Sequence, residues 1–185
     1  MKTAIVKLKS ASPYSQSKFV MSEKMDKESS ADFEERTWKE RAHITNNGHV
    51  FIPPMQFKNA IAAAAKYLSI QIPGKGKATY TKHFEAGILI TDGIVLPEKL
   101  ETIKAETVMC SSDGTRGGSK KVLKTFPIIY DWEGDLTVYV LDETITEKVF
   151  KKHVEEAGKL IGIGRWRPRN NGLYGRFDVL GIEWE

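Results

Sequence analysis

The chain has 185 residues and a formal net charge of +4, with 41% hydrophobic and 28% charged residues. This is the composition of one ordinary globular domain, which we expect to extend over residues 1–185. No apolar run approaches the roughly 20 residues that span a bilayer, and residues 1–9 alternate like a strand instead of forming a signal peptide. The one cysteine, Cys110, permits neither an internal disulfide nor a multi-cysteine metal cluster. We therefore expect a protein of the reducing cytoplasm that uses no cofactor.

Hydrophobic periodicity predicts a chain that alternates between strands and helices. Strands are predicted at residues 3–10, 49–52, 121–129, 135–140 and 175–184, with two more short strands within residues 84–96. Helices are predicted at residues 31–41, 55–68 and 146–160, and the polar residues 14–30 predict a long mobile loop or arm. This order fits a β-α-β-β-α-β plan with insertions, which is an α+β fold with an antiparallel sheet and helices on one face.

Local signals support three of these elements. Asp92-Gly93 predicts a hairpin turn between the two short strands. Phe57 and Ile61 recur at helical spacing in an alanine-rich segment, which favours a helix at residues 55–68. Thr144 or Thr146 is the expected N-cap of the last helix.

Positive charge gathers in three glycine-containing segments without acidic residues, at residues 73–83, 114–124 and 158–176. The acidic residues lie mainly elsewhere, at residues 23–40, 98–106 and 131–156. Because the basic segments resemble loops, an extended polyanion such as a nucleic-acid strand fits them better than a single nucleotide.

The strongest functional signal lies at residues 157–179, with five glycines, four arginines, a tryptophan and a tyrosine. Glycine lets a backbone turn sharply and approach a ligand closely, arginine suits phosphate, and aromatic rings stack on bases. The alternative is a helix-to-strand connection with solubilising charge. The residues expected to bind nucleic acid here are Arg165, Trp166, Arg167, Arg169, Asn170, Asn171, Tyr174 and Arg176.

Arg165, Arg167 and Arg169 alternate along the chain, so a locally extended segment would place them on one side, toward phosphates. Trp166 would then face the other way, into the core or onto a base, and the core is the interpretation that we favour. Replacing Arg165 and Arg167 with alanine should accordingly weaken binding to all sequences alike and reduce its salt dependence.

Three further groups of side chains are candidates for the same ligand. Lys58 lies near the start of a predicted helix, where backbone amides attract anions, although it also fits an ordinary exposed lysine. The second group belongs to a basic loop that alternatively stays disordered without ligand, and it comprises Lys75, Lys77, Tyr80 and Lys82. The third group indicates a hairpin tip that grips a backbone, or a solvated loop, and it comprises Arg116, Lys120 and Lys121.

The four histidines raise the question of catalysis, because histidine can act as a general base on a ribose 2′-hydroxyl. None of them lies in a recognised catalytic context, and their spacing matches no usual pair of metal ligands. Residues 73–77 (PGKGK) lack the hydroxyl residue that follows the lysine of a phosphate-binding loop. We therefore expect neither an enzyme nor a metal site.

Three segments carry a family resemblance: residues 7–13 (KLKSASP), residues 51–60 (FIPPMQFKNA), and Gly164-Arg165 together with Gly175-Arg176-Phe177. In this order they resemble the RAMP superfamily of CRISPR-associated proteins, and within it the backbone subunits that coat guide RNA. The C-terminal glycine segment is the specific part, whereas the rest resembles the family by segment order. The chain is short for such a subunit, and short stand-alone relatives resemble phage proteins whose ligand could be single-stranded DNA.

The resemblance implies a modified ferredoxin-like (RRM-like) core with a hairpin thumb, a strand bound along a positive groove, and head-to-tail assembly. The expected function is non-catalytic, largely sequence-independent binding of RNA or single-stranded DNA by a homo-oligomer in a bacterial or phage-infected cell. The alternatives are a metal-independent endoribonuclease of the RAMP type and a phage protein-interaction module that mimics a backbone subunit. Nothing in the sequence identifies a 2′-hydroxyl contact that would separate RNA from DNA.

Overall fold

The computed structural model describes residues 1–112 and 118–185 and shows an α+β chain in which the paired strands are antiparallel. The strands are β1 (Lys2–Ser10), β2 (Tyr14–Ser15), β3 (His49–Ile52), β4 (Ile88–Leu89), β5 (Ile94–Lys99), β6 (Lys104–Ser111), β7 (Lys121–Ile129), β8 (Glu133–Val140) and β9 (Phe177–Trp184). The helices are α1 (Ser30–Thr37), α2 (Pro54–Leu68), α3 (Thr81–Ala86) and α4 (Glu147–Glu156), with 3-10 turns at Trp38–Arg41 and Pro168–Asn170 and a π-helical turn at Ala157–Ile161. In this described part, no helix is long and apolar enough to cross a membrane.

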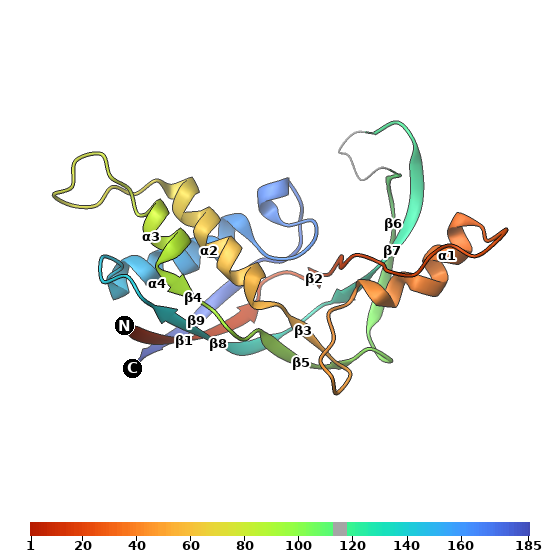
Figure 1. Cartoon of the computed structure of the whole chain (residues 1–185), viewed down its shortest axis with the longest axis horizontal. Coiled ribbons are helices and arrows are strands. Elements are labelled where there is room, and N and C mark those ends of the chain that lie inside the picture. Colours follow the sequence, from red (N-terminus) through yellow and green to blue (C-terminus); the bar gives the residue numbers. More distant parts are fainter. Residues whose placement is uncertain (113–117) are drawn as a thin grey trace.

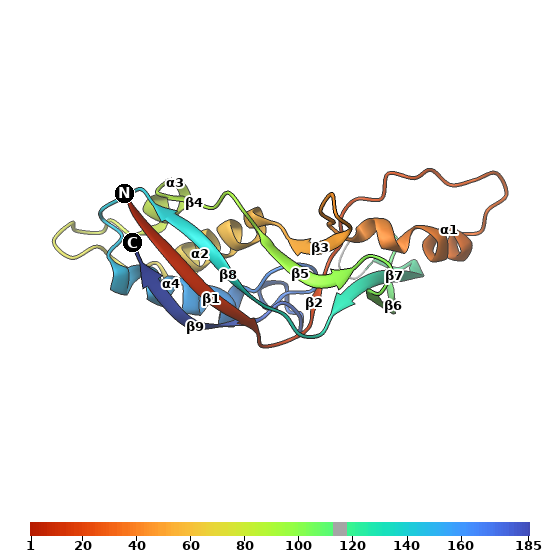
Figure 2. The same ribbon diagram turned by 90° about the horizontal axis from the view of Figure 1, so that it is seen from below.

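The central sheet has four strands in the order β4-β8-β1-β9. Val6 of β1 lies opposite Leu136 of β8 on one side and Ile182 of β9 on the other. Helices α2 and α4 lie together on one face of this sheet (Figures 1 and 2). In chain order, α2 precedes β4 and α4 precedes β9. This arrangement is compatible with the predicted β-α-β-β-α-β plan.

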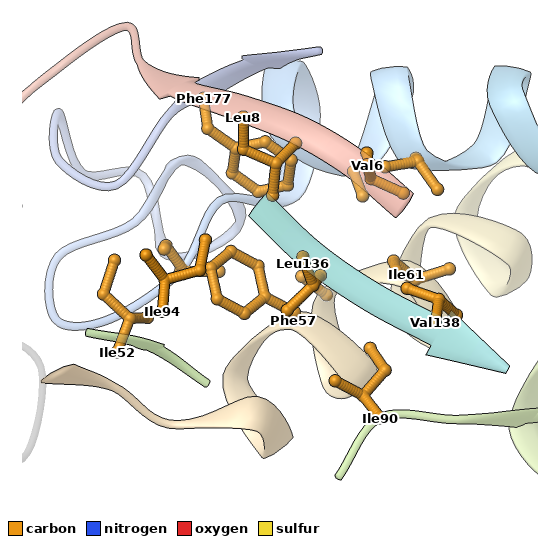
Figure 3. Packing of buried hydrophobic residues seen from close by; sticks show 14 of the residues in the cluster. Val6, Leu8, Ile52, Phe57, Ile61, Ile90, Ile94, Leu136, Val138 and Phe177 are labelled. Carbon is orange, nitrogen blue, oxygen red and sulfur yellow. The ribbon is translucent and has the colours of Figure 1, made fainter. Parts of the chain in front are cut away.

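The core lies between the central sheet and these helices (Figure 3). Helix α2 begins with Pro54, whose fixed φ suits a first helical turn, and it buries three alanines, Ala60, Ala64 and Ala65. Its Phe57 and Ile61 are buried against sheet residues such as Val6. The predicted helix at residues 55–68 is confirmed.

Helix α4 is capped by Thr146, whose side-chain oxygen accepts a hydrogen bond from the backbone nitrogen of Val149 at 3.4 Å. The α-helix ends at Glu156, earlier than predicted, and continues as the π-helical turn Ala157–Ile161. Within this turn, a Cβ atom on Gly158 would lie 2.0 Å from the carbonyl oxygen of Phe177. Glycine at this position lets the end of the helix pack directly against β9.

Strands β6 and β7 form a long hairpin that projects from the sheet and, together with α1, makes up the far end of the molecule (Figure 1). Strand β2 adds to β7, so this part forms a second sheet of order β2-β7-β6. The predicted helix at residues 31–41 is present as α1 and the following 3-10 turn, with Ser29 as N-cap. Strand β6 was not predicted from the sequence.

The predicted hairpin at Asp92-Gly93 is wrong. Strand β4 pairs with β8 in the central sheet, whereas β5 pairs with β3. Gly93 does not form a hairpin turn; it lets the chain pass close to β3, because a Cβ atom there would lie 2.0 Å from the carbonyl oxygen of Ile52. Helix α3, just before β4, was also missed.

Candidate nucleic-acid interface

Residues 162–176, which we call the glycine loop, connect the π-helical turn after α4 to β9. The backbone nitrogen of Arg165 donates to the carbonyl oxygen of Ser15 at 2.9 Å, and that of Gly175 donates to the carbonyl oxygen of Pro13 at 2.8 Å. A third bond, from the Ile163 nitrogen to the Gly175 oxygen, closes the loop on itself at 2.9 Å. The loop is therefore tied to the segment that follows β1.

At three glycines of this loop, the protein's own backbone occupies the space that a side chain would need. A Cβ atom at Gly175 would lie 1.8 Å from the carbonyl oxygen of Ile163, and one at Gly172 would lie 1.7 Å from that of Trp166. Gly164 leaves only 2.5 Å to the oxygen of Ser15. The close approaches that require glycine are thus to the chain's own backbone, which explains the glycine content through packing.

The alternation predicted for the arginines is wrong, because the segment is not extended. Trp166 has φ +58°, and Pro168–Asn170 form a short 3-10 turn. The strand alternation that would place Arg165, Arg167 and Arg169 on one side therefore does not apply here.

Arg165 packs against the β6–β7 hairpin. Its guanidinium carbon lies 3.6 Å from the ring centroid of Phe126 on β7, and Nη2 lies 3.7 Å from Sγ of Cys110 on β6. Nη1 is buried and has no hydrogen-bond partner among the described residues. Arg165 thus connects the glycine loop to the hairpin, and its cation rests on an aromatic face as such pairs prefer.

Tyr174 makes a second connection to the hairpin. Its hydroxyl donates to the carboxylate of Glu106 on β6, and both carboxylate oxygens lie 2.7 Å from the hydroxyl oxygen. Burial, and then the hydrogen bond to Glu106, raises the pKa of Tyr174 to about 12. Burial and the hydrogen bond to Glu106 thus keep the phenol protonated, and Tyr174 links the glycine loop to β6.

Two other arginines of the loop, Arg167 and Arg176, are partly buried. Arg176 donates to the carbonyl oxygens of Lys159 at 3.3 Å and Leu173 at 3.5 Å. Arg167 is half-buried, and its Nε atom is enclosed without a partner in the part of the chain that the structure describes. Arg176 therefore supports the loop, and both arginines leave less of their charge exposed than the sequence suggested.

The remaining predicted residues of the loop form an exposed face. Arg169, Asn170 and Asn171 are exposed, and Asn171 adopts the left-handed conformation that ends the 3-10 turn. Trp166 is 47% exposed, so the interpretation that its ring enters the core is wrong. An indole, a guanidinium and two amides are therefore exposed to solvent on this short loop.

The hairpin carries further cations near the glycine loop. Lys121 lies opposite Ser111, one pair beyond the Cys110–Val122 pair that Arg165 touches, so strand alternation points its side chain to the other face of the hairpin. Lys120 is exposed next to it. Lys121 donates to the Ser111 hydroxyl at 3.0 Å. Lys124, which the predicted site did not include, belongs to the same strand. Arg116 lies outside the described residues.

Two predicted ligand contacts are corrected by the structure. The Nζ atom of Lys58 donates to the carbonyl oxygens of Phe84 at 3.1 Å and Glu85 at 2.8 Å, so it caps the end of α3 instead of drawing an anion to α2. Burial lowers the pKa of Lys58. Tyr80 is 5% exposed and packs edge-on against the ring of His153, so it offers no face to a base.

The other basic loop lies apart from the glycine loop. Residues 73–78, which we call the lysine loop, project from the opposite end of the molecule (Figures 1 and 2). Lys75 and Lys77 are exposed there, and Lys82 is exposed on α3. The structure therefore brings the glycine loop and the hairpin together, but it does not bring the lysine loop to them.

The four histidines lie around α3, α4 and β3. His153 is fully buried, stacks on Phe84 with ring centroids 4.3 Å apart, and has its pKa lowered by burial. His83 pairs with Asp142 at 2.6 Å. His43 packs edge-on against Phe51, and His49 contacts the carbonyl oxygen of Leu96. Within residues 1–112 and 118–185, no group of three or more histidine, cysteine or acidic side chains is placed to hold a metal ion.

No protein-family model and no curated protein matches the sequence. Among solved structures, Cmr6 from Pyrococcus furiosus aligns with a TM-score of 0.48 and 14% identity, over 97% of this chain and 99% of that one. A Cas6 product complex aligns with a TM-score of 0.32 and 12% identity, over 95% of this chain and 50% of the other. Scores and identities this low establish neither a shared fold nor a family, so the proposals below rest on the geometry of this chain.

Proposed function

We propose that this protein binds single-stranded nucleic acid, RNA or DNA, without cleaving it and largely without regard to sequence. The observation that carries the proposal is the exposed face of the glycine loop beside the basic hairpin. There Trp166 and Arg169 are exposed on an acid-free stretch, and Lys120 and Lys124 belong to the adjoining hairpin, with Lys124 on the same strand face as the Cys110–Val122 pair. Flat aromatic faces and cations together are what a single strand requires from its binding surface.

The cations in this proposal act on phosphates. Arg169, Lys120 and Lys124 take part in none of the ion pairs found among the described residues. Lysine and arginine that neutralise phosphates release counterions, so affinity should fall as salt rises, whatever the base sequence. Titrating labelled RNA and DNA strands of the same sequence at several salt concentrations tests this proposal, and binding that ignores salt would contradict it.

We also propose a modified ferredoxin-like core and side-by-side assembly of copies along the strand. The charge at the two ends supports assembly: residues 23–40 carry seven acidic and four basic side chains, whereas the lysine loop at the opposite end carries no acid. Contacts between unlike surfaces build filaments instead of closed dimers. Size measurements with and without a single strand test this part, and a strictly monomeric complex at saturation would contradict it.

The absence of catalysis is a proposal with its own test. Labelled RNA incubated with the protein in the presence of EDTA should remain intact. Cleavage under these conditions that disappears when a histidine is replaced with alanine would instead identify a metal-independent endoribonuclease.

A further inference from the structure

Trp166 has an unusual backbone conformation. Among the described residues, only four residues other than glycine have positive φ, and Trp166 at +58° is the only aromatic among them. This conformation costs a bulky side chain free energy that glycine or asparagine would largely avoid. The ring does not recover this cost by full burial, because the residue remains 47% exposed. A strained and exposed tryptophan suggests that its ring has a use beyond folding.

The indole is held by planar groups that the hairpin fixes in place. The Arg165 guanidinium lies between two rings, 3.6 Å from the Phe126 centroid and 5.1 Å from that of Trp166. Tyr174 stands perpendicular to the indole with centroids 5.8 Å apart, and its hydroxyl is bound by Glu106. Residues of both hairpin strands thus fix the supports of the ring. An aromatic surface fixed in advance loses little entropy when a ligand stacks on it.

The other aromatic candidates do not offer such a surface. Tyr80 is buried, and the Tyr174 hydroxyl is occupied by Glu106. Tyr67 on α2 is 68% exposed, but it lies outside the glycine loop and the hairpin. Trp166 alone among them combines an exposed ring, a fixed position and a surrounding stretch of chain without acidic residues.

We infer that Trp166 is a stacking platform for one unpaired base, and that Arg165 is a positioning residue behind it and not a phosphate ligand. This inference rests on the proposed function and specifies which part of the ligand the glycine loop recognises. Every base has a π-face, so the platform accepts any base. A base within a duplex is already stacked and paired, so the platform selects single strands. Phosphate contacts fall to Arg169 and to the hairpin lysines.

The most direct test compares a labelled oligothymidylate with a strand of the same length that carries abasic sites, using the unchanged protein. The base-bearing strand should bind about 5- to 150-fold more tightly, as expected for one lost stacking contact. Trp166→Leu keeps an apolar side chain without a flat face and should remove this difference, whereas Trp166→Tyr should retain most of it. Tyr67→Leu removes an exposed aromatic elsewhere and is the matched control, which should change nothing.

Arg165→Lys separates positioning from charge. The variant keeps the positive charge but loses the planar group between the rings. The affinity ratio of base-bearing to abasic strand should fall while the salt slope stays the same. An unchanged affinity ratio in Arg165→Lys would contradict the positioning role. Arg165→Gln removes the charge, and a salt slope reduced by about 0.7 in that variant would show instead that Arg165 binds phosphate.

The remaining outcomes are decisive as well. Equal binding of both strands by the unchanged protein would overturn the stacking platform and leave the proposed function intact. Failure of both strands to bind at low salt would overturn the stacking platform and the proposed function together. Because the strand comparison needs no variant, it decides the matter even if a substitution prevents folding.

Discussion

The glycine loop and the lysine loop look alike in sequence, since both combine glycines with cations and lack acidic residues, but the structure uses them differently. In the glycine loop, backbone atoms of the protein occupy the space where the Cβ atoms of Gly172 and Gly175 would lie. In the lysine loop, nothing lies within 4 Å of a Cβ atom placed on Gly74 or Gly76. Glycine therefore serves close packing in the first loop and only local turning in the second.

This difference bears on binding. A loop packed against its neighbours presents side chains in a fixed arrangement, whereas a loop without such packing must lose conformational freedom when it binds. We therefore expect the glycine loop to contribute more to affinity than the lysine loop, even though both are basic.

The largest expected effect contrasts glycines of the two loops. Gly175→Ala places a Cβ atom 1.8 Å from the Ile163 oxygen at φ +77°, and should destabilise the fold by roughly 3 kcal/mol. Gly76→Ala, at φ +60° in open space, should cost about 1 kcal/mol from backbone strain alone. Urea unfolding of both variants measures the difference, and equal losses would contradict the contrast.

A smaller effect contrasts the cations of the two loops. Arg169→Ala should reduce the slope of log affinity against log salt by about 0.7, the value for one phosphate contact on a single strand. Lys75→Ala/Lys77→Ala should reduce it by less, although it removes two charges, because the lysine loop lies apart from the exposed face. The slopes come from titrations at several salt concentrations. A larger change of slope in the lysine-loop variant would show that the nucleic acid binds at the lysine loop instead.

The smallest effect concerns the anchor of the lysine loop, where Tyr80 packs on buried His153. Burial lowers the pKa of His153 below its ordinary 6.5. The unfolded chain therefore binds a proton at His153 more readily than the folded chain does. The neutral, buried His153 contributes to stability above its ordinary pKa, and this contribution is lost as the pH falls below that value. His153→Phe should lose less stability between neutral and acidic pH than the unchanged protein. Identical pH dependence in denaturant unfolding would contradict this.

Local patterns in the sequence were sufficient to predict several elements. Helix α2 follows from Phe57 and Ile61 at helical spacing, and α4 follows from its apolar stripe and the Thr146 cap. Helix α3 has one fully packed apolar side chain, Phe84, which is too little for a periodic signal. Strand β6 was missed because only Ser111 at its end is buried, and the apolar Met109 is exposed between half-buried neighbours, so no apolar side chain marks a core face.

The candidate site was predicted in composition but not in geometry. The glycine loop was identified correctly as a connection between the last helix and the last strand. The roles of Arg165 and Lys58 depend on partners 26 or more residues away in sequence, at Cys110 and Phe84. Local reasoning treats each as a free cation and cannot identify such partners. The exposure of Trp166 likewise follows from a turn with positive φ, which a tryptophan rarely adopts.

The central claim is that this chain binds a single nucleic-acid strand. The most direct measurement is a fluorescence anisotropy titration of a labelled single strand and of the same strand annealed to its complement, at low and at physiological salt. We predict saturable binding of the single strand that weakens as salt rises, with weaker binding of the duplex. Absence of saturable binding at low salt, or tighter binding of the duplex, would contradict the account.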